Sequence, residues 1–164
     1  MPSPTKIAKT TRYFDPEVSK VYFLTTIAAS TFIPTRTEIT AGKDLTDEIA
    51  DLNGWVVGSD QLDTPDMGSR FPKKIGGMLT VDDSSLTFYA DEAGDDIRSV
   101  LPRQTRGFIV FCDGGDVEDN KADCFPVEVL SNSQQRSLSD AARRMVQFSI
   151  TDRPAESFAL PANT

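Results

Sequence analysis

Apolar and polar residues alternate with a period of two along most of the chain, and this pattern predicts β-strands. Two segments alternate strictly, with apolar side chains at Phe125, Val127, Val129, Val146, Phe148 and Ile150. The run Arg106–Cys112 is almost continuously apolar, which is typical of a central strand covered on both faces. Further strands are expected over residues 20–27, 44–57 and 73–90, so the chain should form about six or seven strands.

Two of these expected strands contain an irregularity. Residues 73–90 change parity, because Leu79 and Val81 alternate on odd positions while Leu86 and Phe88 alternate on even ones. A hairpin turn or a bulge near residues 82–85 must absorb this change, since a shift of one residue exchanges the two faces of a strand. The expected strand over 44–57 is interrupted at Asn53-Gly54, a dipeptide that favours a turn or a bulge.

Helical signals are few. Residues 34–41 are compatible with one helical turn ended by Gly42, and residues 94–101 form the best helical pattern. In that pattern Asp95 or Asp96 supplies the cap, the apolar residues from Ile97 are spaced i, i+3 and i+4, and Pro102 ends the helix. We therefore expect a mainly β fold, either a β-sandwich or a partly open barrel, with one short helix on its flank.

Three segments lack a hydrophobic period. Residues 58–72 contain two glycines and two prolines, and a loop of about 15 residues in a compact domain is usually functional or disordered. Residues 1–13 and 157–164 resemble unstructured terminal arms. The polar residues 131–140 are expected to connect two strands. With these assignments residues 1–164 form a single domain.

Composition narrows the possible chemistry. The 164 residues include 17 basic and 25 acidic side chains, a net charge of −8, and no histidine. The acidic balance argues against a nucleic-acid binder held by a basic face, and the missing histidine excludes Ser–His and Cys–His nucleophiles and histidine-ligated metals. Two cysteines are too few for a disulfide framework. We predict no enzymatic activity, no metal and no cofactor.

The charge is distributed unevenly. Residues 1–43 carry six basic and three acidic side chains, whereas residues 44–164 carry 11 basic and 22 acidic ones. One interpretation is chance variation of a solvated surface. The other is a basic arm, with Lys6, Lys9 and Arg12, that contacts an acidic body, either its own or that of a neighbouring subunit.

Individual candidate residues favour structural roles. Cys112 and Cys124 follow the strand pattern and are expected to be buried thiols, and Trp55 is expected in the core or at a subunit interface. The acidic segment 113–123 faintly resembles a calcium loop but lacks its ligand spacing. No apolar run approaches the roughly 18 residues of a membrane span, and the polar N-terminus lacks the apolar centre of a signal peptide. We expect a soluble protein made in a cytoplasm.

Several collinear segments resemble a known family. They are VYFLTTIA (21–28), PTRTEITAGKDLTDEI (34–49), DTPDMGSRF (63–71), DSSLTFYAD (83–91), GFIVFCDGGD (107–116) and VQFSITDRPAE (146–156). Together they resemble the major tail protein of long-tailed phages of actinobacteria, over about residues 20–160. None of the segments is a catalytic signature.

The resemblance implies a virion protein whose subunits form hexameric rings that stack into a tail tube. Each subunit adds strands to a continuous inner barrel around a DNA channel, and a long loop with the terminal arms reaches neighbouring subunits. The candidate residues of the loop are Asp60, Leu62, Asp63, Asp66, Met67, Arg70 and Phe71. A tape measure protein, a tail terminator and a distal tail protein are the implied partners, beside DNA that passes without specific binding.

The polar face of the alternating strands is the candidate lining of the channel. Its candidate residues are Asp44, Asp47, Glu128, Gln147, Ser149 and Thr151. Carboxylates and hydroxyls repel or ignore phosphates, so an acidic lining would let DNA slide. Two alternatives remain open: another tail protein, such as a terminator, a head–tail connector or a contractile inner tube, and a cytosolic enzyme or ligand-binding β-sandwich.

Overall fold

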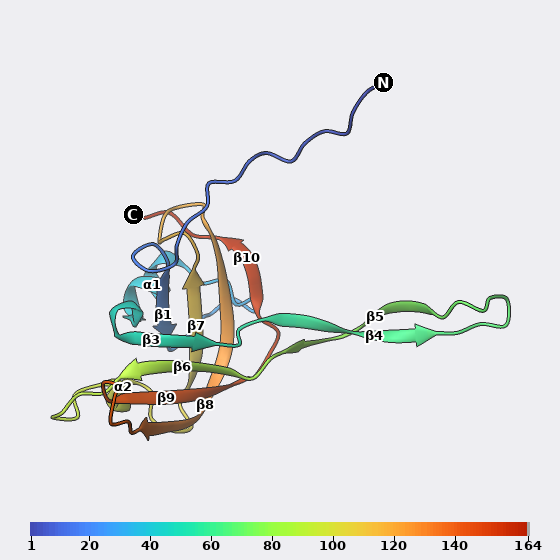
Figure 1. Cartoon of the computed structure of the whole chain (residues 1–164). Helices are drawn as coiled ribbons and strands as arrows, with labels where there is room; N and C mark the ends of the chain where they lie inside the picture. The colour runs from blue at the N-terminus through green and yellow to red at the C-terminus, as the bar shows by residue number, and fades with distance from the viewer. Residues whose placement is uncertain (164) are drawn as a thin grey trace.

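The computed structural model describes residues 1–163 and is mainly β (Figure 1). The strands are β1 (Lys20–Leu24), β2 (Lys43–Asp44), β3 (Ile49–Asn53), β4 (Val57–Thr64), β5 (Lys73–Val81), β6 (Ser84–Tyr89), β7 (Arg106–Cys112), β8 (Lys121–Gln135), β9 (Arg143–Ile150) and β10 (Ala155–Ala159). The helical elements are α1 (Arg36–Ala41), α2 (Ile97–Val100) and the short 3-10 helix η1 (Thr46–Glu48). Among the described residues, no helix has the length and apolarity to cross a membrane.

Eight strands form one sheet and the other two form a separate hairpin. The main sheet has the order β2-β1-β7-β8-β9-β6-β3, with β10 added on β8, and every pairing is antiparallel. The sheet is not closed into a complete barrel, and the fold class predicted from the alternation is confirmed. Arg106–Cys112 is a strand flanked by β1 and β8, with the predicted bounds.

The concave face of the sheet carries the main core. Its side chains are almost fully buried and are those that the alternation assigned to the apolar face, including Phe125, Val127, Val129, Val146 and Phe148. Trp55 lies between the aromatic residues of this core, with ring centroids 5.0 Å from Phe111, 5.3 Å from Phe125 and 5.4 Å from Phe148. Its indole N–H donates to the Ser85 carbonyl at 3.1 Å, so the expected packing role of Trp55 in the core is confirmed.

A second core covers the opposite face of β1, β7 and β8. Ile39 of α1 and Phe158 of β10 pack there with Leu24, Val110 and both cysteines. The expectation of an unstructured C-terminal arm at 157–164 is therefore wrong for its first residues. Phe158 and Leu160 are buried, and burial of these two side chains outweighs the conformational entropy lost in ordering the chain end. Thr164 lies outside the described residues.

Both predicted helices form, and side-chain caps define their starts. In α1 the Thr35 hydroxyl accepts the Glu38 N–H, and the Glu38 carboxylate accepts the Thr35 N–H, which is a capping box. In α2 the Asp96 carboxylate accepts the Arg98 N–H at 3.0 Å. α2 is shorter than the expected 94–101, because Asp91 and Asp96 hold residues 91–95 in a hydrogen-bonded turn before it.

The parity change near residues 82–85 marks a passage between two sheets. β5 belongs to the hairpin and β6 belongs to the main sheet, so neither the hairpin turn nor the in-strand bulge expected there is present. The segment that joins β3 to β4 passes close to Asp83 at Gly54, which has φ +83°. A Cβ at this position would lie 2.3 Å from the Asp83 carbonyl oxygen. Only glycine fits there. β3–β4 and β5–β6 thus form one long ribbon that bends where it leaves the body.

Candidate assembly surfaces

The hairpin β4–β5 projects from the body, and beyond its base no other part of the described chain lies beside it (Figure 1). The expectation of a loop over residues 58–72 is corrected, because Gly58–Thr64 belongs to β4 and only residues 65–72 form the connection. The strand escaped detection because β4 pairs only with β5 and, apart from its first residue Val57, packs against no core. Backbone hydrogen bonds hold it, and these leave no hydrophobic period in the sequence.

One face of the hairpin carries an apolar stripe. Direct cross-strand pairing places Val57 opposite Val81, Ser59 opposite Leu79 and Leu62 opposite Ile75. A bulge in β5, where Gly77 and Met78 lie opposite Asp60, leaves the alternation of β4 unchanged. Leu62 and Ile75 therefore form the stripe on one face of the outer hairpin, whereas Val57, Leu79 and Val81 form a second apolar patch on the opposite face, near the body.

The stripe is open to solvent. Leu62 and Ile75 are 54% and 56% exposed, although each is an apolar side chain of a paired strand. The opposite face carries the ion pair of Lys74 with Asp63, at 3.4 Å, and nearer the body it carries Leu79, which is 53% exposed. The exposed apolar surface of the outer hairpin favours a covering partner.

The tip of the hairpin, residues 65–72, adds two large apolar side chains. Met67 and Phe71 are exposed there. The tip is ordered locally: Asp66 accepts the Gly68 N–H at 2.9 Å and pairs with Lys73 at 3.2 Å. The residues singled out from the sequence in this region are all exposed along the hairpin, namely Asp60, Leu62, Asp63, Asp66, Met67, Arg70 and Phe71.

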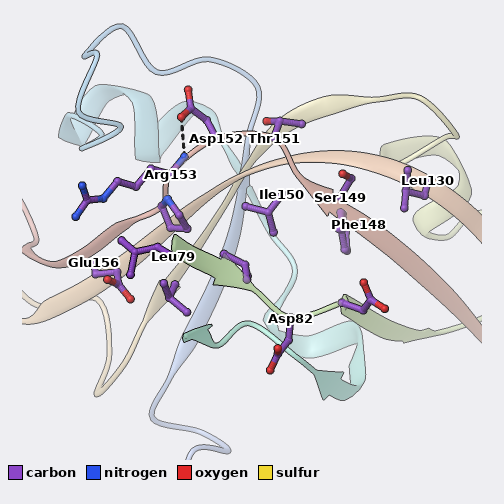
Figure 2. Close-up of a pocket in the computed structure, with 14 residues that line it drawn as sticks. Leu79, Asp82, Leu130, Phe148, Ser149, Ile150, Thr151, Asp152, Arg153 and Glu156 are labelled. Atoms are coloured by element: carbon purple, nitrogen blue, oxygen red, sulfur yellow. Dashed lines mark hydrogen bonds between the residues drawn. The ribbon is translucent and has the colours of Figure 1, made fainter. Parts of the chain in front are cut away.

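A groove lies at the base of the hairpin, and Figure 2 shows the side chains around it. Its volume is about 450 Å³, and it is lined by Val57, Leu79 and Val81 of the hairpin together with Leu130, Phe148 and Ile150. Asp152 and Arg153 lie at its rim, where the Asp152 carboxylate accepts the Arg153 N–H at 2.7 Å. The apolar surface is thus continuous from the body to the hairpin.

The polar face of β8, β9 and β6 carries several of the predicted channel residues. Glu128 lies opposite Ser149, and Gln147 lies opposite Ser131 on one side and Ser85 on the other. The Ser131 hydroxyl contacts the Gln147 amide oxygen at 3.2 Å. The chain reaches Thr151 directly after β9. Hydroxyl and amide groups therefore dominate this face, and the main core lies on the other face of the same strands.

The structure does not group Asp44 and Asp47 with these residues. Asp44 lies on β2, at the opposite edge of the sheet, and its carboxylate accepts the Thr46 N–H at 2.9 Å. Asp47 lies in η1. The sequence pattern did not indicate Ser85 and Ser131, which occupy the same face as Gln147. The bulge between Val129 and Ser131 shifts the alternation at that point, so the sequence pattern ends before the strand does.

Glu128 reduces the acidity that was expected on this face, because it is paired. The Arg106 guanidinium lies 3.3 Å from its carboxylate. Arg106 directly faces Glu128 in the neighbouring strand β7, and opposite charges in such a pair attract each other. The face is polar rather than strongly acidic.

The N-terminal arm, residues 1–14, has no secondary structure and extends away from the body (Figure 1). Lys6, Lys9 and Arg12 are exposed on it. The apolar side chain of Ile7, between two of these cations, is also exposed.

The cysteines are buried, and a carboxylate of the acidic turn is bound by side chains of the same chain. Cys112 and Cys124 are buried free thiols, and burial raises the pKa of each to about 12. In the turn after β7, the Asp116 carboxylate is bound by Arg36 at 3.0 Å and accepts the Tyr22 hydroxyl at 3.1 Å. Within residues 1–163, no three His, Cys, Asp or Glu side chains are grouped to hold a metal ion.

Comparison with known families shows to which family the chain belongs. The sequence model of a family described as "Phage tail tube protein" matches residues 7–163. The chain belongs to this family. It is therefore a structural tail tube protein of a phage, as the resemblance of its sequence segments implied.

Two solved structures share the fold of this tail tube protein. A chain of the anti-feeding prophage (AFP) baseplate, 6-fold symmetrised, aligns with a TM-score of 0.54 at 11% identity, covering 92% of this chain and 97% of that one. A chain from the tail of an empty GTA particle, computed with C6 symmetry, aligns with a TM-score of 0.52 at 8% identity, covering 90% and 100%. No curated protein sequence matches the tail tube protein.

Proposed function

We propose that this tail tube protein forms hexameric rings that stack into the non-contractile tube of a long-tailed phage, through which DNA enters the host. The observation that carries the proposal is the projecting hairpin β4–β5, whose apolar stripe has no partner within the described chain. Support for six-fold rings comes from the fold shared with chains in assemblies described with 6-fold and C6 symmetry.

The hairpin is the proposed contact between successive rings. The eight residues of β4 span about 26 Å at roughly 3.3 Å per residue. With its tip, the hairpin extends about as far as a compact domain of this size is wide, roughly 40 Å. A subunit stacked along the hairpin axis would therefore lie beside the stripe. The exposed Met67, Phe71 and Arg70 would meet its surface.

The polar face with Glu128, Gln147, Ser149 and Thr151 is the proposed lining of the channel. It holds hydroxyl and amide groups, and its carboxylate at Glu128 is paired with Arg106. DNA phosphates would find little unpaired positive charge at these positions. Such a lining binds DNA neither by charge nor by stacking on aromatic rings. Asp44 and Asp47 are not part of the proposed lining.

The remaining roles follow from the family. The N-terminal arm with Lys6, Lys9 and Arg12 is proposed to contact a neighbouring subunit. A tape measure protein, a tail terminator and a distal tail protein are the proposed partners at the tube's length and ends. The proposed place of synthesis is the cytoplasm of an actinobacterial host, and the protein has no catalytic role.

Cryo-electron microscopy of intact phage tails tests the proposal. We expect a tube in which six copies of this fold form each ring, with one hairpin of each copy crossing to the next ring. A tube of another protein, with this chain confined to one end of the tail, would overturn the proposal. So would hairpins that contact only solvent in the assembled tail.

Lysines on the proposed lining should slow the passage of DNA. Gln147→Lys with Ser149→Lys places new positive charges on each subunit, and every ring repeats them along the tube. We expect normal tubes, with DNA release slowed about tenfold at low salt and recovering as salt screens the phosphates. Release is measured by dye binding to ejected DNA. Ser137→Lys with Ser139→Lys, in the β8–β9 connection, is the control. Equal release by both variants would contradict the assignment.

A further inference from the structure

A second groove lies beside β3, where the sheet remains open, and extends to Gly54 and Trp55. It has a volume of about 670 Å³ and is lined by residues from β1, β3, β7, β8 and the segment before β1. Its apolar lining includes Trp55, Phe111 and Phe125, whose rings pack against one another. We call it the acidic groove, because six carboxylates line it: Asp15, Glu17, Asp47, Asp51, Asp113 and Asp123.

The negative charge of the acidic groove is not neutralised by the described chain. The ion pairs formed by residues 1–163 involve none of its six carboxylates, and Lys20 is the one basic residue among those lining it. Burial and the charges of Asp123 and Asp15 raise the pKa of Asp113. This repulsion between neighbouring carboxylates favours binding of a cationic segment.

The N-terminal arm has the complementary composition. Residues 1–14 contain Lys6, Lys9 and Arg12 and no acidic side chain. Ile7, between the two lysines, is fully exposed and would lose apolar surface against an aromatic floor. The arm and the acidic groove therefore match in both of their chemical features, basic with acidic and apolar with apolar.

We propose that the acidic groove binds the N-terminal arm of a neighbouring copy of this chain, with Lys6 and Lys9 at the carboxylate rim and Ile7 against the aromatic floor. The proposal rests on the proposed function, because the stacked rings place the neighbouring copy within reach. It explains why the basic and acidic residues of this sequence are separated between the arm and the body.

Geometry favours a neighbour's arm over the chain's own arm. Asp15, at the root of the arm, already lines the groove, and from there the chain runs away from the body (Figure 1). Residues 1–12 extended at about 3.3 Å each reach roughly 40 Å, which is about the width of a domain of this size. The arm therefore reaches an adjacent subunit, whereas occupying its own groove requires a reversal at its root.

Disulfide cross-linking of full-length chains tests the proposal. Ala8→Cys places a thiol on the arm and Ala50→Cys places one in the groove, while Cys112 and Cys124 remain buried. Chains with one change each are co-assembled and oxidised. We expect a cross-linked dimer from the mixture and a ladder from the double variant. The pair Ala8→Cys with Ala141→Cys, at the exposed loop after β8, is the control and should give at least tenfold less product.

The possible failures are distinguishable. Tubes without a cross-linked dimer would overturn the groove assignment and leave the tube intact. A cross-linked monomer from the double variant, with no dimer from the mixture, would show that the arm occupies its own groove, which also overturns the proposal. A dimer formed by concentrated free subunits without tubes would support the groove and contradict the proposed function.

Charge exchange adds a second test. Lys6→Glu with Lys9→Glu should reduce cross-linking about tenfold at low salt, and Asp47→Lys with Asp51→Lys on the partner chain should restore it. Arg136→Glu, at the exposed loop between β8 and β9, is the matched control and should change nothing. A reduction without rescue would show that the arm binds elsewhere.

Discussion

Shortening the hairpin is expected to abolish tube assembly and leave a folded subunit. The change replaces residues 62–75 by Asn-Gly, so that Gln61 and Gly76, which are paired in the present structure, flank a two-residue turn. The removed residues contact no part of the body, so the melting temperature should stay within a few degrees of the wild type. The shortened hairpin lacks the tip and the apolar stripe that are proposed to contact the next ring. Negative-stain microscopy should therefore show no tubes.

Two point-substituted variants separate the apolar stripe from the hairpin's length. Leu62→Asn with Ile75→Thr keeps the strands but removes apolar surface from the stripe, and it should reduce tube formation at least tenfold. Asp63→Asn with Lys74→Gln removes the exposed ion pair on the opposite face, a contribution of about 0–1 kcal/mol, and should assemble normally. Full-length tubes from the shortened hairpin would contradict the stacking role.

Trp55→Ala should destabilise the subunit by about 3 kcal/mol, because it removes a large, half-buried aromatic side chain that packs against the main core. The indole packs against Phe111, Phe125 and Phe148, and its N–H bond to Ser85 is lost as well. Urea denaturation of the free subunit measures the change in the free energy of unfolding. Because the total stability of a small domain is about 5–15 kcal/mol, this variant should be close to unfolding at 37 °C.

The controls for Trp55 distinguish ring packing from the hydrogen bond. Trp55→Phe keeps an aromatic ring, so it should lower the free energy of unfolding clearly less than Trp55→Ala does. Its remaining effect comes mainly from the Ser85 carbonyl, which loses its hydrogen-bond donor. Phe14→Ala, at an exposed position of the arm, should change stability by less than about 0.5 kcal/mol. A loss below about 1 kcal/mol for Trp55→Ala would show that the ring does not hold the main core together.

Local patterns in the sequence were sufficient for several elements. Arg106–Cys112 was predicted with its exact bounds, Asp96 was one of the two caps predicted for α2, and Gly42 was predicted to end α1. These features depend on neighbouring residues: a strand buried on both faces is apolar throughout, and a cap is a short-range hydrogen bond. The same holds for the apolar faces of β8 and β9.

The hairpin shows why other features were missed. Beyond Val57 its strand β4 faces no core, so its sequence lacks a period, and the bulge in β5 is defined only by the pairing with β4. The strand β10 was taken as an arm because Phe158 and Leu160 are too few to form a pattern. They are buried against α1 and β8, which are far away in the sequence.

The sequence alone determined that this is a mainly β protein with an apolar core, no histidine chemistry, a basic N-terminal arm and an acidic body. Those properties depend on the total number of residues of each type or on their pattern over a few neighbouring positions. The tertiary structure alone decided that the ribbon leaves the body at Gly54, that Leu62 and Ile75 share one exposed face of it, and that six carboxylates line one groove. Each of these depends on contacts between residues far apart along the chain, and such contacts leave no local signal in the order of the amino acids.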